Sequence, residues 1–81
     1  MSNQQFNSDM GLRIEVAVNG ERREIPAGLN VRQMLLYLNL DPQRVAVELN
    51  RTIVRKTLWD STSVEADANV EIVEFVGGGS R

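Results

Sequence analysis

Apolar residues occupy every second position along residues 12–18. This period of two is typical of a strand that buries one face. Asn19 and Gly20 follow, and this pair favours a type I′ hairpin turn because both central positions need a positive φ. Residues 21–25 then form the returning strand, whose charges suit the edge of a sheet, and Pro26 ends it.

A helical period replaces this alternation in the next segment. Asn30 is a suitable N-cap, and Gln33 three residues later completes the pattern of a capping box. We therefore expect a helix over residues 31–39 that ends before Pro42. Its apolar face is formed by Val31, Met34, Leu35 and Leu38.

Further strands are predicted in the second half of the chain. Residues 44–49 alternate again and residues 53–54 form a short strand, with a turn at residues 50–51 between them. Residues 55–63 have no period, and we expect one tight helical turn there, around residues 58–59. The chain therefore continues as a sheet after its single long helix.

The most apolar strand comes last. Residues 70–76 (VEIVEFV) are predicted to lie at the centre of the sheet, after a short strand that begins at Val64 and a turn at residues 67–69. A hairpin, one amphipathic helix and then more strands predict an α+β domain in which the sheet half-wraps the helix.

The chain divides into three parts on this interpretation. Residues 1–10 are polar and without a period, so we expect a disordered lead. Residues 11–76 form the domain, and residues 77–81 form a flexible tail rich in glycine.

Some apolar residues are predicted to face away from the helix. If the even positions of the last strand are buried, its odd positions point to the other side of the sheet. Such a surface on a sheet with one helix indicates a partner. The alternative is that residues 55–63 cover it, with Trp59 as a lid. The outward apolar residues are Ala17, Ala46, Val73 and Phe75.

Composition removes several kinds of site. The chain has no cysteine and no histidine, which excludes disulfides, a cysteine nucleophile and most zinc sites. The net charge is −2 and the cations are scattered, so no nucleic acid is expected as a partner. The apolar stretches are too short to span a bilayer and no secretory signal is present, so we expect a cytoplasmic protein without a membrane partner.

Three glycines follow the last predicted strand. Gly77, Gly78 and Gly79 have no side chains to pack, and they can enter a channel that is too narrow for other residues. A carboxyl group at the end of such a tail can be presented to the active site of a partner. The alternative is an inert flexible linker, because Gly-Gly-Gly-Ser is also common in artificial linkers.

Four segments together carry a resemblance to a known family. They are residues 45–50 (VAVELN), residues 53–54 (IV), Trp59 and residues 70–79 (VEIVEFVGGG). In this order and spacing they resemble ThiS, the sulfur carrier of the thiamine pathway, in the ThiS/MoaD family, and the resemblance covers residues 12–79. It implies a ubiquitin-like (β-grasp) fold, with a mixed sheet of four to five strands and one helix across one face.

The resemblance implies a carrier protein rather than an enzyme, with no tightly bound cofactor. A ThiF-like adenylating enzyme would use ATP to activate the terminal glycine carboxylate. A sulfur donor protein would then replace AMP to leave a thiocarboxylate, and a ThiG-like thiazole synthase would receive the sulfur. Family members end at the diglycine, whereas Ser80 and Arg81 follow here. Gly79 is therefore the expected acceptor after a trimming peptidase removes them, unless they are an artificial extension.

Other functions remain open from the sequence. Related carriers serve molybdopterin or amino-acid biosynthesis, and the tail does not distinguish these pathways. A non-catalytic ubiquitin-like interaction module would use Val73 and Phe75 while the tail stays inert. A protein modifier would be joined through Gly79 to lysines by the same activation chemistry. A free-standing enzyme is disfavoured because the sequence has no catalytic triad, metal set or phosphate loop.

Overall fold

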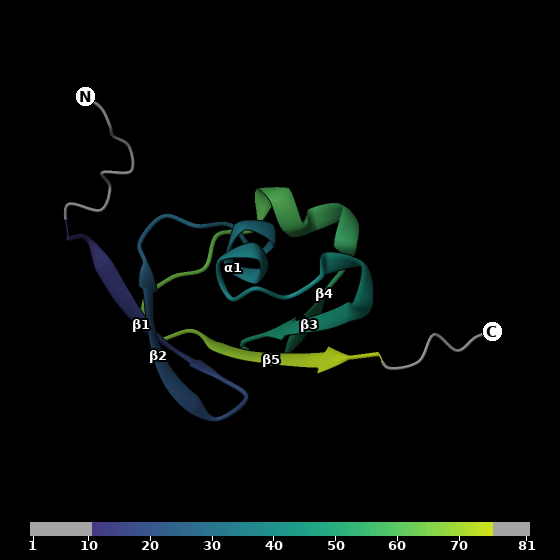
Figure 1. The fold of residues 1–81 in the computed structure, drawn as a ribbon, viewed down its shortest axis with the longest axis horizontal. Helices are drawn as coiled ribbons and strands as arrows, with labels where there is room; N and C mark the ends of the chain where they lie inside the picture. Colours follow the sequence, from purple (N-terminus) through teal and green to yellow (C-terminus); the bar gives the residue numbers. More distant parts are fainter. Residues whose placement is uncertain (1–10, 76–81) are drawn as a thin grey trace.

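The computed structural model of the protein describes residues 11–75, and one layer of sheet with helical segments on one face makes up this part. Figure 1 shows α1 over the sheet, with β5 running beneath it toward the C-terminal end. The elements are β1 (Arg13–Val18), β2 (Glu21–Pro26), α1 (Val31–Tyr37), the 3-10 helix η2 (Pro42–Arg44), β3 (Val45–Leu49), β4 (Thr52–Val54), the 3-10 helix η3 (Lys56–Ser61) and β5 (Asn69–Glu74).

The sheet has five strands in the order β2-β1-β5-β3-β4. β5 pairs in parallel with β1 and antiparallel with β3, while the other neighbours are antiparallel. The predicted central position of the last strand is therefore confirmed, as is a mixed sheet with one helix. β5 lies between the two hairpins and is the strand from which the C-terminal residues continue.

The hairpin between β1 and β2 has the predicted turn. Asn19 and Gly20 have φ values of 51° and 83°, as a type I′ turn requires. β2 lies at one edge of the sheet, and its charged, exposed side chains suit that position because they disfavour pairing with another chain.

Helix α1 begins with the predicted capping box. The side chain of Asn30 accepts a hydrogen bond from the backbone nitrogen of Gln33 at 2.8 Å, and the side chain of Gln33 accepts one from the backbone nitrogen of Asn30 at 2.9 Å. The helix is shorter than predicted because it ends at Tyr37 rather than at Asn39. Asn39 adopts a left-handed φ of 65°, which ends the helix two residues early.

The core lies between α1 and the inner face of the sheet. It contains Trp59, which is only 1% exposed and donates a hydrogen bond from its indole nitrogen to the carbonyl oxygen of Val54 at 2.9 Å. The other buried residues are Val16, Val18, Ile25, Val31, Met34, Leu35, Val45, Val47, Val64, Ala68 and Val70.

Two local predictions near β5 are wrong. Val64 does not begin a strand, because this segment makes only an isolated bridge between Asn30 and Ser63. Asn69, predicted in the turn, is the first residue of β5 and pairs with Ala17. The helical turn predicted around residues 58–59 is confirmed by η3, which is longer than one turn.

Candidate functional site

The end of β5 leads into the predicted glycine tail. β5 ends at Glu74, and the backbone nitrogen of Phe75 still donates a hydrogen bond to the carbonyl oxygen of Arg44 at 2.7 Å. The backbone is therefore held up to the last described residue, by the end of η2 that directly precedes β3. Gly77, Gly78 and Gly79 lie outside the described residues, as does Val76, so their predicted roles remain predictions.

The outer face of the sheet, opposite α1, carries exposed apolar side chains near this end of β5. Val73 is 59% exposed and Phe75 is 56% exposed. The alternative that residues 55–63 cover them is wrong, because Trp59 is buried in the core and does not form a lid over this face. Their role as a partner surface remains a prediction.

Pairing between β3 and β5 places one predicted residue directly beside another. Ala46 is the partner of Val73, and both are exposed. Ile53 on β4 is 73% exposed and lines the same groove as these two residues. Ile53 was predicted only as part of a short strand, after a predicted turn and before Val54, which is half-buried. We call Ala46, Ile53, Val73 and Phe75 the outer patch.

Ala17 does not belong to this patch. It is half-buried and pairs with Asn69 at the beginning of β5. Val73 lies four residues further along the strand, which is about 13 Å at the usual rise per residue. The structure therefore brings together three of the four predicted residues and separates the fourth from them.

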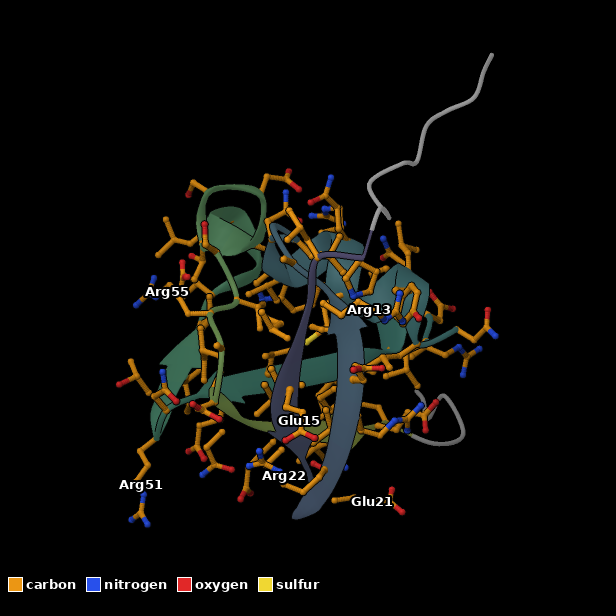
Figure 2. All side chains as sticks on the ribbon, turned by 90° about the vertical axis from the view of Figure 1, so that its left-hand side faces the viewer. Arg13, Glu15, Glu21, Arg22, Arg51 and Arg55 are labelled. Carbon is orange, nitrogen blue, oxygen red and sulfur yellow. The ribbon has the colours of Figure 1, made fainter. Side chains whose placement is uncertain are left out.

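Carboxylates lie next to the outer patch. Glu48 on β3 is the direct partner of Glu71 on β5, and Glu48 is also the partner of Ile53 on β4. Arg51 lines a neighbouring hollow with both glutamates, but within residues 11–75 it forms no ion pair with either. Its side chain extends away from the body of the protein in Figure 2.

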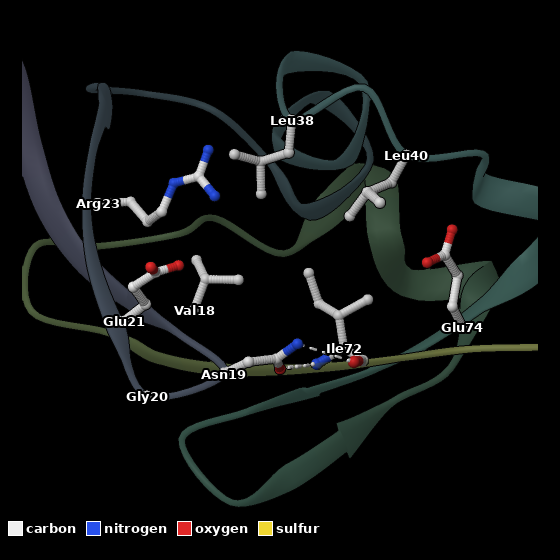
Figure 3. Close-up of a pocket in the computed structure, with 9 residues that line it drawn as sticks. All are labelled: Val18, Asn19, Gly20, Glu21, Arg23, Leu38, Leu40, Ile72 and Glu74. Atoms are coloured by element: carbon white, nitrogen blue, oxygen red, sulfur yellow. Dashed lines mark hydrogen bonds between the residues drawn. The ribbon is translucent and has the colours of Figure 1, made fainter.

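A separate cavity lies on the other face of the sheet, the helix side, between the tip of the β1–β2 hairpin and the end of α1. It has a volume of about 480 Å³, with an apolar floor that includes Val18, Leu38 and Ile72. Figure 3 shows Asn19 at its base, where the side chain is hydrogen-bonded to the backbone of Ile72. Charged residues at its rim are Glu21, Arg23 and Glu74.

A cluster of ion pairs lies around Arg22 on the β1–β2 hairpin, away from the outer patch. Figure 2 shows Arg22 beside Glu15, with which it forms an ion pair, and Arg22 also contacts Asp67 at 3.5 Å. The hydrogen bond and charge of Glu15, followed by those of Asp67, raise the pKa of Arg22 above its usual value. Arg22 thus stays charged, and the cluster of Arg22, Glu15 and Asp67 is a local ion-pair network.

The described part of the chain contains no cluster of metal ligands and no membrane-spanning helix. Among residues 11–75 there is no group of three or more carboxylate, histidine or cysteine side chains placed to hold a metal ion. No helix among these residues is both long enough and apolar enough to cross a membrane.

Comparison with known proteins relates this chain to one family. A sequence model of the ThiS family matches residues 16–79, which include the last strand and the three glycines. A thiazole synthase of Paramagnetospirillum magneticum is 39% identical over 67 residues, covering 83% of this chain but only 21% of that protein. The chain thus spans about a fifth of the length of this synthase. The uncharacterized protein ycf40 of Porphyra purpurea is 35% identical over 66 residues, covering 82% of this chain and 93% of the relative.

Solved structures give the same answer for the fold. The crystal structure of the thiamine biosynthesis protein ThiS from Geobacter metallireducens superposes with a TM-score of 0.70 at 32% identity, covering 82% of this chain and all of that one. The predicted ubiquitin-like (β-grasp) fold is thereby confirmed. With the family match extending over most of the domain and through the glycines, this chain belongs to the ThiS family.

Proposed function

We propose that this protein carries sulfur for formation of the thiamine thiazole, as a thiocarboxylate on its C-terminal glycine. The observation that carries this proposal is the ThiS family match through residue 79, which includes the glycines that follow β5. Gly79 is the proposed acceptor, once Ser80 and Arg81 no longer follow it. A carboxyl group inside a peptide bond cannot be activated in this way.

The proposed chemistry needs activation because a carboxylate is a poor electrophile. An adenylating enzyme joins the carboxylate oxygen to the α-phosphorus of ATP and releases pyrophosphate. The terminal sulfur of a persulfide on the donor protein then attacks the acyl carbon and expels AMP, which forms an acyl disulfide. A second thiol cleaves the sulfur–sulfur bond, so the carrier keeps the sulfur as a thiocarboxylate and the donor side is left as a disulfide. In this proposal the partner proteins supply the catalytic groups, and the carrier supplies only the carboxyl group that is activated.

A thiazole synthase is the proposed recipient of the sulfur. The support is that the matching proteins of Paramagnetospirillum magneticum and Magnetococcus marinus are named thiazole synthase, and that each contains a region similar to this chain. Such a region within a longer synthase favours physical association between the two activities. The outer patch beside the end of β5 is the proposed docking surface, because it is apolar, exposed and next to the strand that leads into the tail.

The proposal is tested by intact mass spectrometry. A chain that ends at Gly79 is incubated with a ThiF-like adenylating enzyme, ATP and a sulfur donor protein. Replacement of one oxygen by sulfur should increase the mass by the difference between the two elements. The full-length chain is the matched control and should show the shift only when a peptidase that removes Ser80 and Arg81 is added. A chain ending at Gly79 that remains unchanged would refute the proposal.

A ubiquitin-like interaction module is the second candidate, and the exposed outer patch is the observation that favours it. In that case a partner binds through Val73 and Phe75, and the C-terminal carboxyl group takes no part. The two functions differ in one measurement. A module keeps its partner and its biological activity when Gly78 and Gly79 are deleted, whereas a sulfur carrier loses its activity completely.

A further inference from the structure

The outer face of the sheet contains a groove of about 220 Å³ with two chemical halves. Its apolar half is formed by Ala46, Ile53 and Val73 of the outer patch. The other half is formed by the carboxylate-bearing residues Glu48 and Glu71. No basic residue lines this groove. A positive charge could therefore reach it only from a partner or from Arg51 in the neighbouring hollow.

The two glutamates are directly opposite one another in the β3–β5 pairing. Side chains at such positions start about 5 Å apart, and like charges there destabilise a sheet. Within residues 11–75, neither carboxylate forms an ion pair. By contrast, Glu15 and Glu24 on the same sheet are each paired with an arginine. Among the described residues, the negative charge beside the outer patch is therefore not neutralised by an ion pair.

We propose that this groove binds an arginine or lysine side chain of the thiazole synthase. The aliphatic stem lies on Ala46, Ile53 and Val73, and the cationic end lies between Glu48 and Glu71. The inference deepens the proposed function and rests on it, because it specifies the chemistry by which the recipient of the sulfur docks.

A long basic side chain is the occupant that satisfies both halves of the groove. Lysine and arginine combine a hydrocarbon stem with a charged end, and they cover apolar surface while the charge meets its partner. A guanidinium also donates several hydrogen bonds, which suits two neighbouring carboxylates. A wholly apolar occupant would remove water from the glutamates without replacing their hydrogen bonds, and an acidic occupant would be repelled.

The test uses the full-length chain and the thiazole synthase from the same genome. The double variant Glu48→Gln/Glu71→Gln removes both charges with little change in shape. Glu65→Gln is the matched control, because Glu65 is exposed in the loop before β5 and forms no ion pair within residues 11–75. Dissociation constants are measured by titration calorimetry at low and high salt, and melting temperatures by circular dichroism.

We expect the double variant to bind about tenfold more weakly and to lose most of its salt dependence. Its melting temperature should be equal to that of the wild type or higher, because a repulsive pair is removed. Glu65→Gln should change the dissociation constant by less than about twofold. Binding that is unchanged in the double variant, or weakened equally by Glu65→Gln, would overturn the inference.

Two other outcomes would also overturn it. A lower melting temperature of the double variant would identify Arg51 as an internal counter-ion of Glu48 and Glu71. If the wild-type chain does not bind the synthase at all, a basic side chain of the synthase cannot be the occupant of the groove. The proposed function is judged separately, since the gain of sulfur by a chain ending at Gly79 does not require the synthase. Failure of the docking inference is therefore distinguishable from failure of the carrier proposal.

Discussion

Asn19 and Ile72 are 53 positions apart in the chain and are joined by two hydrogen bonds. The side-chain nitrogen of Asn19 donates to the carbonyl oxygen of Ile72 at 3.1 Å, and its side-chain oxygen accepts from the backbone nitrogen of Ile72 at 2.7 Å. β1 and β5 pair through only two residue pairs. Asn19 thus extends the connection between the hairpin and the strand that leads toward the tail.

Replacing Asn19 with glycine should lower the free energy of unfolding by about 1–2 kcal/mol, the sum expected for two partly exposed hydrogen bonds. Glycine tolerates the φ of 51° at this turn position, so the change reports on the side chain rather than on backbone strain. Urea unfolding measures the effect.

Asn39→Gly is the matched control for this change. Asn39 also has a positive φ, of 65°, but its side chain makes no hydrogen bond within residues 11–75. The free energy of unfolding of Asn39→Gly should stay within about 0.5 kcal/mol of the wild-type value. Equal losses for the two variants would show that the contacts with Ile72 contribute nothing.

Trp59→Phe should destabilise the domain by about 1–3 kcal/mol. The change leaves a gap in the core and removes the donor that satisfies the carbonyl oxygen of Val54. Tyr37→Phe also removes one hydrogen bond, from Arg13 to the hydroxyl, but Tyr37 is exposed, so its effect should be below about 0.5 kcal/mol. Thermal unfolding of both variants tests the core position of Trp59. Similar losses of stability in the two variants would contradict it.

Phe75→Arg should weaken binding to the partner enzymes by about tenfold or more while the domain stays folded. The side chain is exposed, so the substitution costs little stability, but it places a charge in the outer patch. Leu58→Arg is the control, because Leu58 is similarly exposed but lies on η3 rather than on the sheet. Surface plasmon resonance measures binding, and circular dichroism confirms the fold. Unfolding of Phe75→Arg would instead place Phe75 in the core.

Deletion of Gly78 and Gly79 should abolish sulfur transfer and change the melting temperature by less than about 2 °C. The reason is that every buried core residue identified within residues 11–75 lies before the tail, the last being Val70. Mass spectrometry measures transfer and calorimetry measures stability. A large loss of stability would mean that the glycines pack on the domain rather than serve as a free acceptor.

The local elements were predictable because short-range interactions determine them. The Asn19–Gly20 pair specifies its own turn, and Asn30 with Gln33 specifies the start of α1, through contacts within a few residues. The end of α1 was missed because a left-handed Asn39 is not distinguishable by type from a helical asparagine. The ThiS resemblance was also readable in the sequence, since it depends on the order and spacing of short segments.

The position of Trp59 was not predictable in the same way. An aromatic residue in a segment without a period can lie in the core or cover the sheet. Only the packing of η3 against α1 decides between these positions, and it leaves Val73 and Phe75 exposed. Ile53 was overlooked for a related reason, because its neighbours come from strands that are distant from one another in the sequence.

The sequence by itself determined the hairpin turn, the helix cap, the family and the five strands that form, although it also predicted a strand at Val64 that does not. Each of these features is encoded by neighbouring residues or by their spacing. Only the tertiary structure decided that Ala46 lies beside Val73, that Glu48 faces Glu71 and that Asn19 holds Ile72. The physical reason is that register between strands far apart in the chain is set by packing of the whole core. A pattern of period two predicts which face of a strand each residue lies on, but it does not predict the residue's partner on the neighbouring strand.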